Sequence, residues 1–108
     1  MTRHDDRLAL TYRLAEAADF DLIHVYVEGL RDFGGRQADA YHDRLEQTFQ
    51  TIADNPKMAR ERTEITPPVR IHPCGSHMIV YEIDAQGVYI LRVRHYRENW
   101  AENPVSGP

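Results

Sequence analysis

Two apolar stripes with helical spacing, separated only by Gly34-Gly35, constrain the fold of this chain more than any other feature. In the first stripe, Ile23 and Val27 widen a row that recurs every three or four residues through Ala18, Leu22, Tyr26, Leu30 and Phe33. The second stripe has the same spacing and consists of Ala38, Tyr41, Leu45, Phe49, Ile52 and Ala53. The glycine pair ends the first helix and Asn55-Pro56 stops the second. The pattern predicts a hairpin of two antiparallel helices, each with one apolar face that must be covered.

Strand-like segments flank this helical pair on both sides. Apolar and polar residues alternate from Leu8 to Leu14, which is the pattern of a strand with one buried face. Three further strands are predicted at Val69–Pro73, His77–Asp84 and Val88–Tyr96, and the turns between them are short enough to make an antiparallel meander. The segment Lys57–Pro68 lacks a clear period and ends in two prolines, so a surface loop is expected there.

The predicted order is therefore strand, helix, helix, strand, strand, strand, an α+β fold with the helical hairpin packed on one face of a sheet. A chain of 108 residues has room for one core, which we place in a single domain over residues 1–100. Residues 101–108 are small, polar and bounded by proline, and are expected to form a flexible tail. The second sheet face is then left available, and Met78, Val80, Val88 and Ile90 are expected to expose apolar area there.

Composition narrows the possible functions. The longest apolar run, from Met78 to Tyr81, is too short to span a bilayer, and the amino end is polar, so a cytoplasmic location is expected. The net charge of −4 weighs against strong direct binding of nucleic acid. Charge is uneven, however, because four arginines stand against only Glu82 and Asp84 from Val69 to Arg97. These arginines, Arg70, Arg92, Arg94 and Arg97, predict a local positive surface.

No cofactor is predicted from these residues. The single cysteine, Cys74, excludes an intramolecular disulfide. His72 and Cys74 could face one zinc ion from the same strand, but no further ligands stand at zinc-site spacing, so no metal site is predicted. Cys74 is better explained as a small apolar residue beside a turn.

Several short motifs occur in an order that is more specific than any one of them. They are "LTYRL" at 10–14, "RLEQTFQTIADNPKMAR" at 44–60, "HMIVYEID" at 77–84 and "VYILRVRHYRENW" at 88–100. In this order and spacing they resemble the ParE toxins of bacterial type II toxin–antitoxin modules, a branch of the RelE/ParE superfamily. The resemblance covers nearly the whole chain.

This resemblance implies a toxin that inhibits DNA gyrase by binding and that is neutralised by a ParD-like antitoxin. The carboxyl-terminal segment of ParE toxins is implicated in inhibition, so Arg97 and Trp100 are expected to contact the target. A disordered antitoxin segment is expected to fold against the open sheet face, with its acidic residues meeting the arginines. The predicted antitoxin-binding residues are Arg70, Met78, Val80, Ile90, Arg92 and Arg94. For Arg92 and Arg94, pairing with Glu82 or Asp84 inside the chain is the alternative.

Two other functions remain open at this point. Tyr96 follows His95 where ParE toxins commonly have glycine, and a His-Tyr pair near the end of the last strand is a feature of the ribosome-dependent mRNA endoribonucleases of the superfamily. Such an enzyme needs a base, an acid and cations around the phosphate, and Arg92, His95 and Tyr96 would carry these roles, with Arg94 and Glu82 as further candidates. The negative net charge and the presence of a single lysine, Lys57, weigh against that reading. The third possibility is a non-toxic family member that only binds antitoxin.

Overall fold

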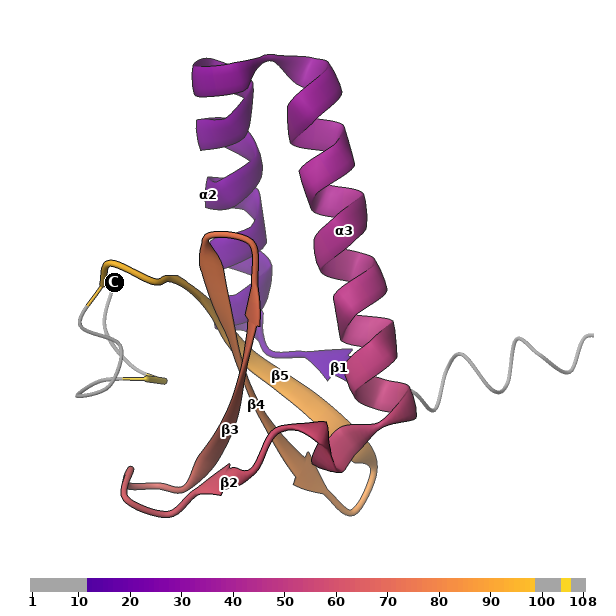
Figure 1. Ribbon diagram of the computed structural model, residues 1–108, viewed down its shortest axis with the longest axis vertical. Coiled ribbons are helices and arrows are strands. Elements are labelled where there is room, and N and C mark those ends of the chain that lie inside the picture. Colours follow the sequence, from indigo (N-terminus) through magenta and orange to yellow (C-terminus); the bar gives the residue numbers. More distant parts are fainter. Residues whose placement is uncertain (1–11, 99–103, 106–108) are drawn as a thin grey trace, which may run out of the picture.

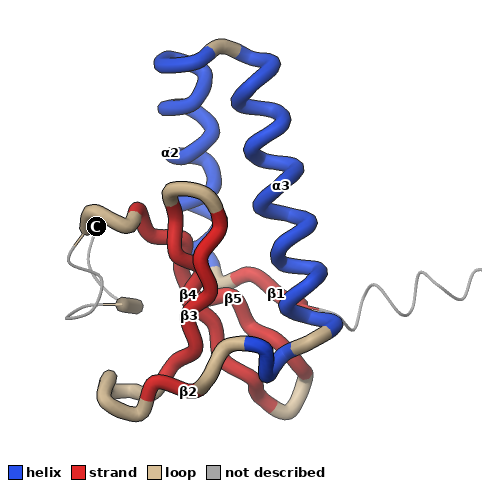
Figure 2. Tube along the Cα trace, viewed as in Figure 1, coloured by secondary structure: helices blue, strands red, loops and turns tan. Residues whose placement is uncertain are grey.

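The computed structural model describes residues 12–98 and 104–105 and confirms the predicted α+β fold (Figure 1). After the short strand β1, two helices form the hairpin, and a sheet of mostly antiparallel strands follows (Figure 2). The elements are β1 Tyr12–Leu14, α2 Glu16–Phe33, α3 Gly35–Asp54, a 3-10 turn at Pro56–Met58, β2 Glu61–Arg62, β3 Val69–Cys74, β4 His77–Asp84 and β5 Gly87–His95. Residues 8–11 of the first predicted strand lie outside the described residues.

The five strands lie in the order β1-β5-β4-β3-β2. β1 runs parallel to β5, with Tyr12 opposite Val88 and Leu14 opposite Ile90, whereas the other neighbours are antiparallel. The first strand of the described chain is therefore joined to the last one. β2 lies within the segment 57–68 that was expected to be only a loop, and Ile65 of that segment is buried.

The main core lies between the helical hairpin and one face of the sheet. Helix α3 contributes Leu45, Phe49 and Ile52, all without exposed surface. Helix α2 contributes Ala18 and Leu22, and it contacts β5. The sheet residues of this core are Cys74, Ile79, Tyr81, Val88, Ile90 and Val93. Figure 1 shows that the tip of the hairpin extends beyond the sheet, so the sheet covers only part of each helix.

A second, smaller core lies on the other sheet face. It consists of Ile65, Val69, Ile71 and Val80, with Met78, Leu91 and Val105 packed against it. The expectation that Val80, Val88 and Ile90 expose apolar area is wrong, because Val88 and Ile90 lie under the helices and Val80 is covered by the chain itself. Met78 is half-buried. Pro104 is also buried, so the two described residues of the predicted tail lie against the fold.

A β-bulge divides β5 into two parts. Tyr81 stands opposite Ile90 and Val80 stands opposite Arg92, so Leu91 is an extra residue on β5. The bulge reverses the alternation of faces along the strand. As a result, Val93 joins the core under the helices, while Arg92 and Arg94 stand opposite Val80 and Met78.

Gly75, in the turn between β3 and β4, has a left-handed backbone with φ of +59°. A Cβ atom there would stand 2.7 Å from the ring of Tyr41. We expect Gly75→Ala to lower the free energy of unfolding by about 2 kcal/mol, because it adds overlap to backbone strain. Urea denaturation would measure the loss. The control is Gly75→Ala in a Tyr41→Ala background, where the ring is absent and only the backbone strain remains. Equal losses in the two backgrounds would contradict the role given to Tyr41.

Candidate functional site

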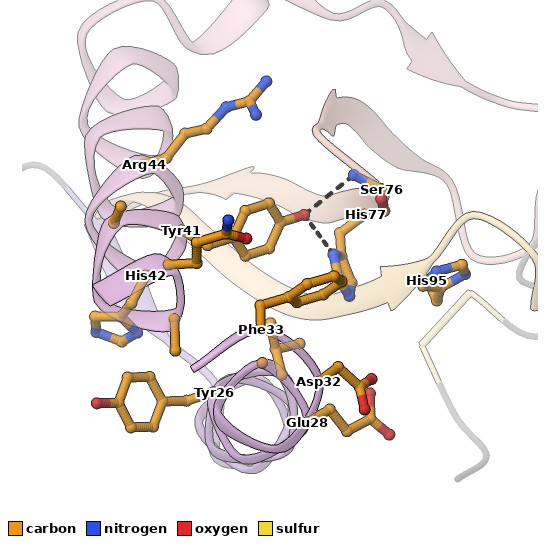
Figure 3. Close-up of a pocket in the computed structure, with 15 residues that line it drawn as sticks. Tyr26, Glu28, Asp32, Phe33, Tyr41, His42, Arg44, Ser76, His77 and His95 are labelled. Atoms are coloured by element: carbon orange, nitrogen blue, oxygen red, sulfur yellow. Dashed lines mark hydrogen bonds between the residues drawn. The ribbon is translucent and has the colours of Figure 1, made fainter. Parts of the chain in front are cut away.

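Two hollows adjoin helix α2. The first, of about 520 Å³, lies between α2, α3 and the β3–β4 turn, and Figure 3 shows its lining. The second, of about 540 Å³, lies between the first half of α2 and β5. Both hollows share Val25, Glu28, His77 and His95. The two hollows therefore meet where the hairpin lies beside the start of β4 and the end of β5.

The hydroxyl group of Tyr41 fixes one wall of the first hollow. The Ser76 backbone N–H donates to it at 3.1 Å, and it lies 2.6 Å from Nδ1 of His77 (Figure 3). It also donates to the Cys74 carbonyl at 3.2 Å. Burial raises the pKa of Tyr41, which keeps the phenol neutral and able to donate. These contacts hold the β3–β4 turn against α3. The backbone that carries His77 is therefore fixed in position.

His77 and His95 stand directly opposite each other on β4 and β5. Their ring centroids are 5.3 Å apart, and the ring of His95 also contacts Tyr96 at 4.8 Å. The Nδ1 atom of His95 accepts a hydrogen bond from the Arg97 backbone N–H at 3.1 Å. Burial, and secondarily the neighbouring His95, lower the pKa of His77. The neutral imidazole is therefore the favoured form of His77 in the folded chain.

This lowered pKa predicts a pH-dependent stability. The folded chain binds the His77 proton more weakly than the unfolded chain does, so the stabilising contribution is complete above the ordinary pKa of 6.5 and is lost as pH falls below it. We expect the free energy of unfolding to decrease between about pH 7.5 and about pH 5.5, and to decrease less in His77→Gln. Urea titrations at both pH values would measure the difference. An identical decrease in both proteins would rule out His77 as its source.

The predicted arginines are engaged inside the chain. The Arg92 guanidinium donates to both carboxylate oxygens of Asp21, at 2.7 and 2.9 Å, and to the carbonyl of Val105 at 2.7 Å. Arg94 pairs with Glu98 at 2.8 Å, and Arg70 donates to the Ala59 carbonyl at 2.7 Å. The predicted internal alternative had Glu82 or Asp84 as partners, but the carboxylates that the structure places beside Arg92 and Arg94 are Asp21 and Glu98.

Of the predicted antitoxin-binding residues, Val80 and Ile90 have no exposed surface, and Arg92 and Arg94 are almost fully buried. Met78 and Arg70 are half-buried. The surface proposed from the sequence is thus largely an internal part of the fold. Asp21 could not be assigned to Arg92 from the sequence, because 71 residues separate them.

The residues of the ribonuclease alternative are only partly brought together. His95 and Tyr96 have their rings in contact, but the Arg92 guanidinium is bound to Asp21. Tyr96 is 48% exposed, and the guanidinium of Arg97 lies 5.6 Å from its ring centroid. Of the two predicted target contacts, Arg97 is exposed, and Trp100 lies outside the described residues.

The resemblance to ParE toxins predicts that Tyr96→Phe retains toxicity, because a residue that only packs against or contacts a target does not need its hydroxyl group. Removing an acid or base from a ribonuclease would instead reduce activity by about a hundredfold or more. Growth inhibition on induction would be compared for both proteins, with circular dichroism as the check on folding. A hundredfold loss in a folded variant would favour the ribonuclease.

Sequence reasoning missed an exposed apolar row along α2. The row, here called the α2 stripe, consists of Phe20, Ile23, Val27, Leu30 and Phe33, which are 41–68% exposed. Its two ends also line the hollows, Phe33 the first and Phe20 the second. The sequence placed most of these residues in one covered stripe together with Ala18 and Leu22. The sequence did contain a sign that part of this face is exposed. Ile23 and Val27 make the apolar stripe predicted from the sequence wider than one packed helix face accommodates.

The described residues contain no group of three or more His, Cys, Asp or Glu side chains that could hold a metal ion. Cys74 is buried, and its Sγ lies 3.3 Å from the hydroxyl of Thr48. Neither described helix is long and apolar enough to cross a membrane.

Comparisons with known proteins agree with this fold. A family model described as "ParE toxin of type II toxin-antitoxin system, parDE" matches residues 12–100. The chain is 31% identical to Toxin ParE1 of Caulobacter vibrioides over 88 residues, which cover 82% of this chain and 91% of that protein. It is also 31% identical to Toxin ParE1 of Mycobacterium tuberculosis over 87 residues, covering 80% of this chain and 89% of that one.

A solved structure of a chromosomal ParDE toxin–antitoxin system from P. aeruginosa has a similar fold. The alignment has a TM-score of 0.70 and covers 79% of this chain and 94% of that one, at 15% sequence identity. At this identity the likeness concerns the fold, in which a helical hairpin packs on a sheet.

Proposed function

Because this chain belongs to the family of ParE toxins of type II toxin–antitoxin systems, we propose that it inhibits DNA gyrase by binding and that a ParD-like antitoxin neutralises it. The toxin acts in the cytoplasm, where gyrase and its DNA are found. It stabilises the cleaved complex of gyrase with DNA and so blocks replication, without catalysis of its own. Family membership supports this target.

The observation that best supports an antitoxin partner is the α2 stripe. Five large apolar side chains in one row lie outside both cores of the described chain. Monomeric proteins rarely expose apolar patches larger than a few hundred Å², and such patches mark interaction sites. A segment that is disordered alone and folds as a helix against this row would cover it.

The proposed contact with gyrase lies at the carboxyl end of the fold. Arg97 is exposed directly after β5, and its guanidinium lies over the exposed ring of Tyr96. An exposed arginine next to an aromatic ring is a common composition of binding hot spots. Arg97 and Trp100 are the residues that we propose to contact gyrase.

Purified protein would be tested in two assays: gyrase supercoiling with detection of cleaved DNA, and cleavage of mRNA on translating ribosomes. We expect inhibited supercoiling with accumulated cleaved DNA, and intact mRNA. Arg97→Ala should weaken the gyrase effect, whereas Arg60→Ala, which alters another exposed arginine, should not. Cleaved mRNA with unaffected gyrase would support the ribonuclease, a possibility favoured by the contact of His95 with Tyr96. No effect in either assay would support a non-toxic antitoxin-binding protein.

A further inference from the structure

We propose that the α2 stripe binds an amphipathic helix whose polar face is basic. The proposal deepens the proposed function and rests on it for the identity of the partner, since the antitoxin would supply the helix. The chemistry of the helix is argued from the described residues alone. It departs from the sequence-based expectation of an acidic partner segment that meets Arg70, Arg92 and Arg94.

The spacing of the α2 stripe indicates a helix as its complement. Successive members are three, four, three and three residues apart, so they form one row along α2. A row with this spacing is the surface into which the apolar side chains of a second helix pack at a small crossing angle. Because the tip of the hairpin extends beyond the sheet, the carboxyl-terminal part of α2 is clear of the strands (Figure 1).

The charge around the stripe selects the polar face of that helix. Residues 16–54, which form the hairpin, contain nine carboxylates and three arginines, whereas the whole chain has a net charge of only −4. Asp21 is paired with Arg92, and the exposed Asp32 is paired with Arg31 at 3.3 Å. Glu16, Asp19 and Glu28 are also exposed on α2. A helix is about 10–12 Å wide and the Debye length is about 10 Å at 0.1 M salt, so these charges act on anything docked along α2.

The same charge disfavours a second copy of this chain on the stripe. Two copies paired through α2 would bring two acidic hairpins together, and like charges across an interface oppose association. A partner helix bearing lysine or arginine beside its apolar row instead gains attraction and a faster association rate. Apolar burial would supply most of the affinity, and charge would supply the choice of partner.

Two synthetic peptides of about 18 residues, long enough to follow α2, would test the proposal. Both carry leucine at every apolar position, and their polar positions are lysine-rich in one and glutamate-rich in the other. We expect the full-length chain to bind the lysine peptide about tenfold more tightly at low salt, since several exposed ion pairs each contribute modestly. The preference should shrink as salt rises.

Variants of the chain make the test specific. Val27→Asp should abolish binding of the lysine peptide, and Ile83→Asp, which places the same charge at an exposed isoleucine on β4, should not. Glu28→Lys combined with Asp32→Lys should remove or reverse the preference between the peptides. Both positions are exposed and lie in the carboxyl-terminal half of α2, where cations are compatible with the helix dipole.

Several results would overturn the proposal. They are equal binding of both peptides, no binding of either, or self-association of the chain that Val27→Asp abolishes, which analytical ultracentrifugation would detect. The supercoiling assay distinguishes failure of this proposal about the α2 stripe from failure of the proposed function. Val27→Asp should still inhibit gyrase if the wild type does, because the α2 stripe is not part of the proposed target contact. If the wild type does not inhibit gyrase, the toxin assignment fails whatever the peptides do.

Discussion

Asp21→Ala is expected to lower the free energy of unfolding by about 3 kcal/mol or more, because it removes the carboxylate that neutralises a buried arginine. The side chains of Asp21 and Arg92 are 15% and 6% exposed, so water cannot replace the lost partner. The same carboxylate also accepts the Val93 backbone N–H at 2.9 Å, beyond the end of β1. The substitution therefore removes a charge pair and also a hydrogen bond to the edge of β5 that β1 does not cover.

Urea denaturation of the purified chain would measure this loss. Asp19→Ala is the control, since Asp19 is exposed on the same helix, and a surface change of this kind costs about 0.5 kcal/mol or less. Replacing both partners, as Asp21→Leu with Arg92→Met, should recover much of the stability, because no buried charge then remains. If Asp21→Ala and Asp19→Ala had similar effects, the buried pair would not be a main support of the fold.

Phe49→Ala is expected to cost about 3 to 5 kcal/mol, the range found when a fully buried aromatic ring is removed. Phe49 has no exposed surface, lies in the main core, and packs its ring 5.6 Å from that of Tyr12 on β1. Since small domains have about 5 to 15 kcal/mol of total stability, the variant should be close to unfolding at room temperature.

Phe33→Ala is the matched comparison for Phe49→Ala. It removes the same side chain from the other helix, at a position that is 68% exposed, so its stability cost should be small. It should nevertheless weaken binding of the lysine-rich peptide, because Phe33 is an end of the α2 stripe. Thermal unfolding followed by circular dichroism, together with peptide binding, would separate the two roles. Comparable destabilisation by both substitutions would show that Phe33 belongs to the core.

The elements of this fold could be predicted because local patterns determine them. The apolar residues recur at every second position in β1 and about every 3.6 positions in α2, which locates both elements. Gly34 forms the turn after α2 with a φ of +89°. The short turns predicted the β3–β4–β5 meander. The parallel pairing of β1 with β5 could not be read from either strand, since it depends on where the helical hairpin returns the chain.

The site was less predictable, because it depends on register and on distant pairs. The extra residue Leu91 in β5 changes which side chains share a face of the sheet. No local sequence pattern predicts this bulge. The burial of Val80 depends on Ile65 and Val105, which come from segments that were read as a loop and a tail. The α2 stripe was read as core, because hydrophobicity alone does not distinguish a face covered within the chain from one reserved for a partner.

The position of β5 in the sheet also determines when this protein can acquire its structure during translation. β5 is the strand that joins β1 to β4, and it is the last strand of the described chain to leave the ribosome. A nascent chain that ends before residue 87 contains the helical hairpin and the strands β1 to β4, but it lacks the strand that connects β1 to the others. Pairing partners this far apart in sequence also slow folding. The sheet can therefore be completed only after β5 has been synthesised and has left the ribosome.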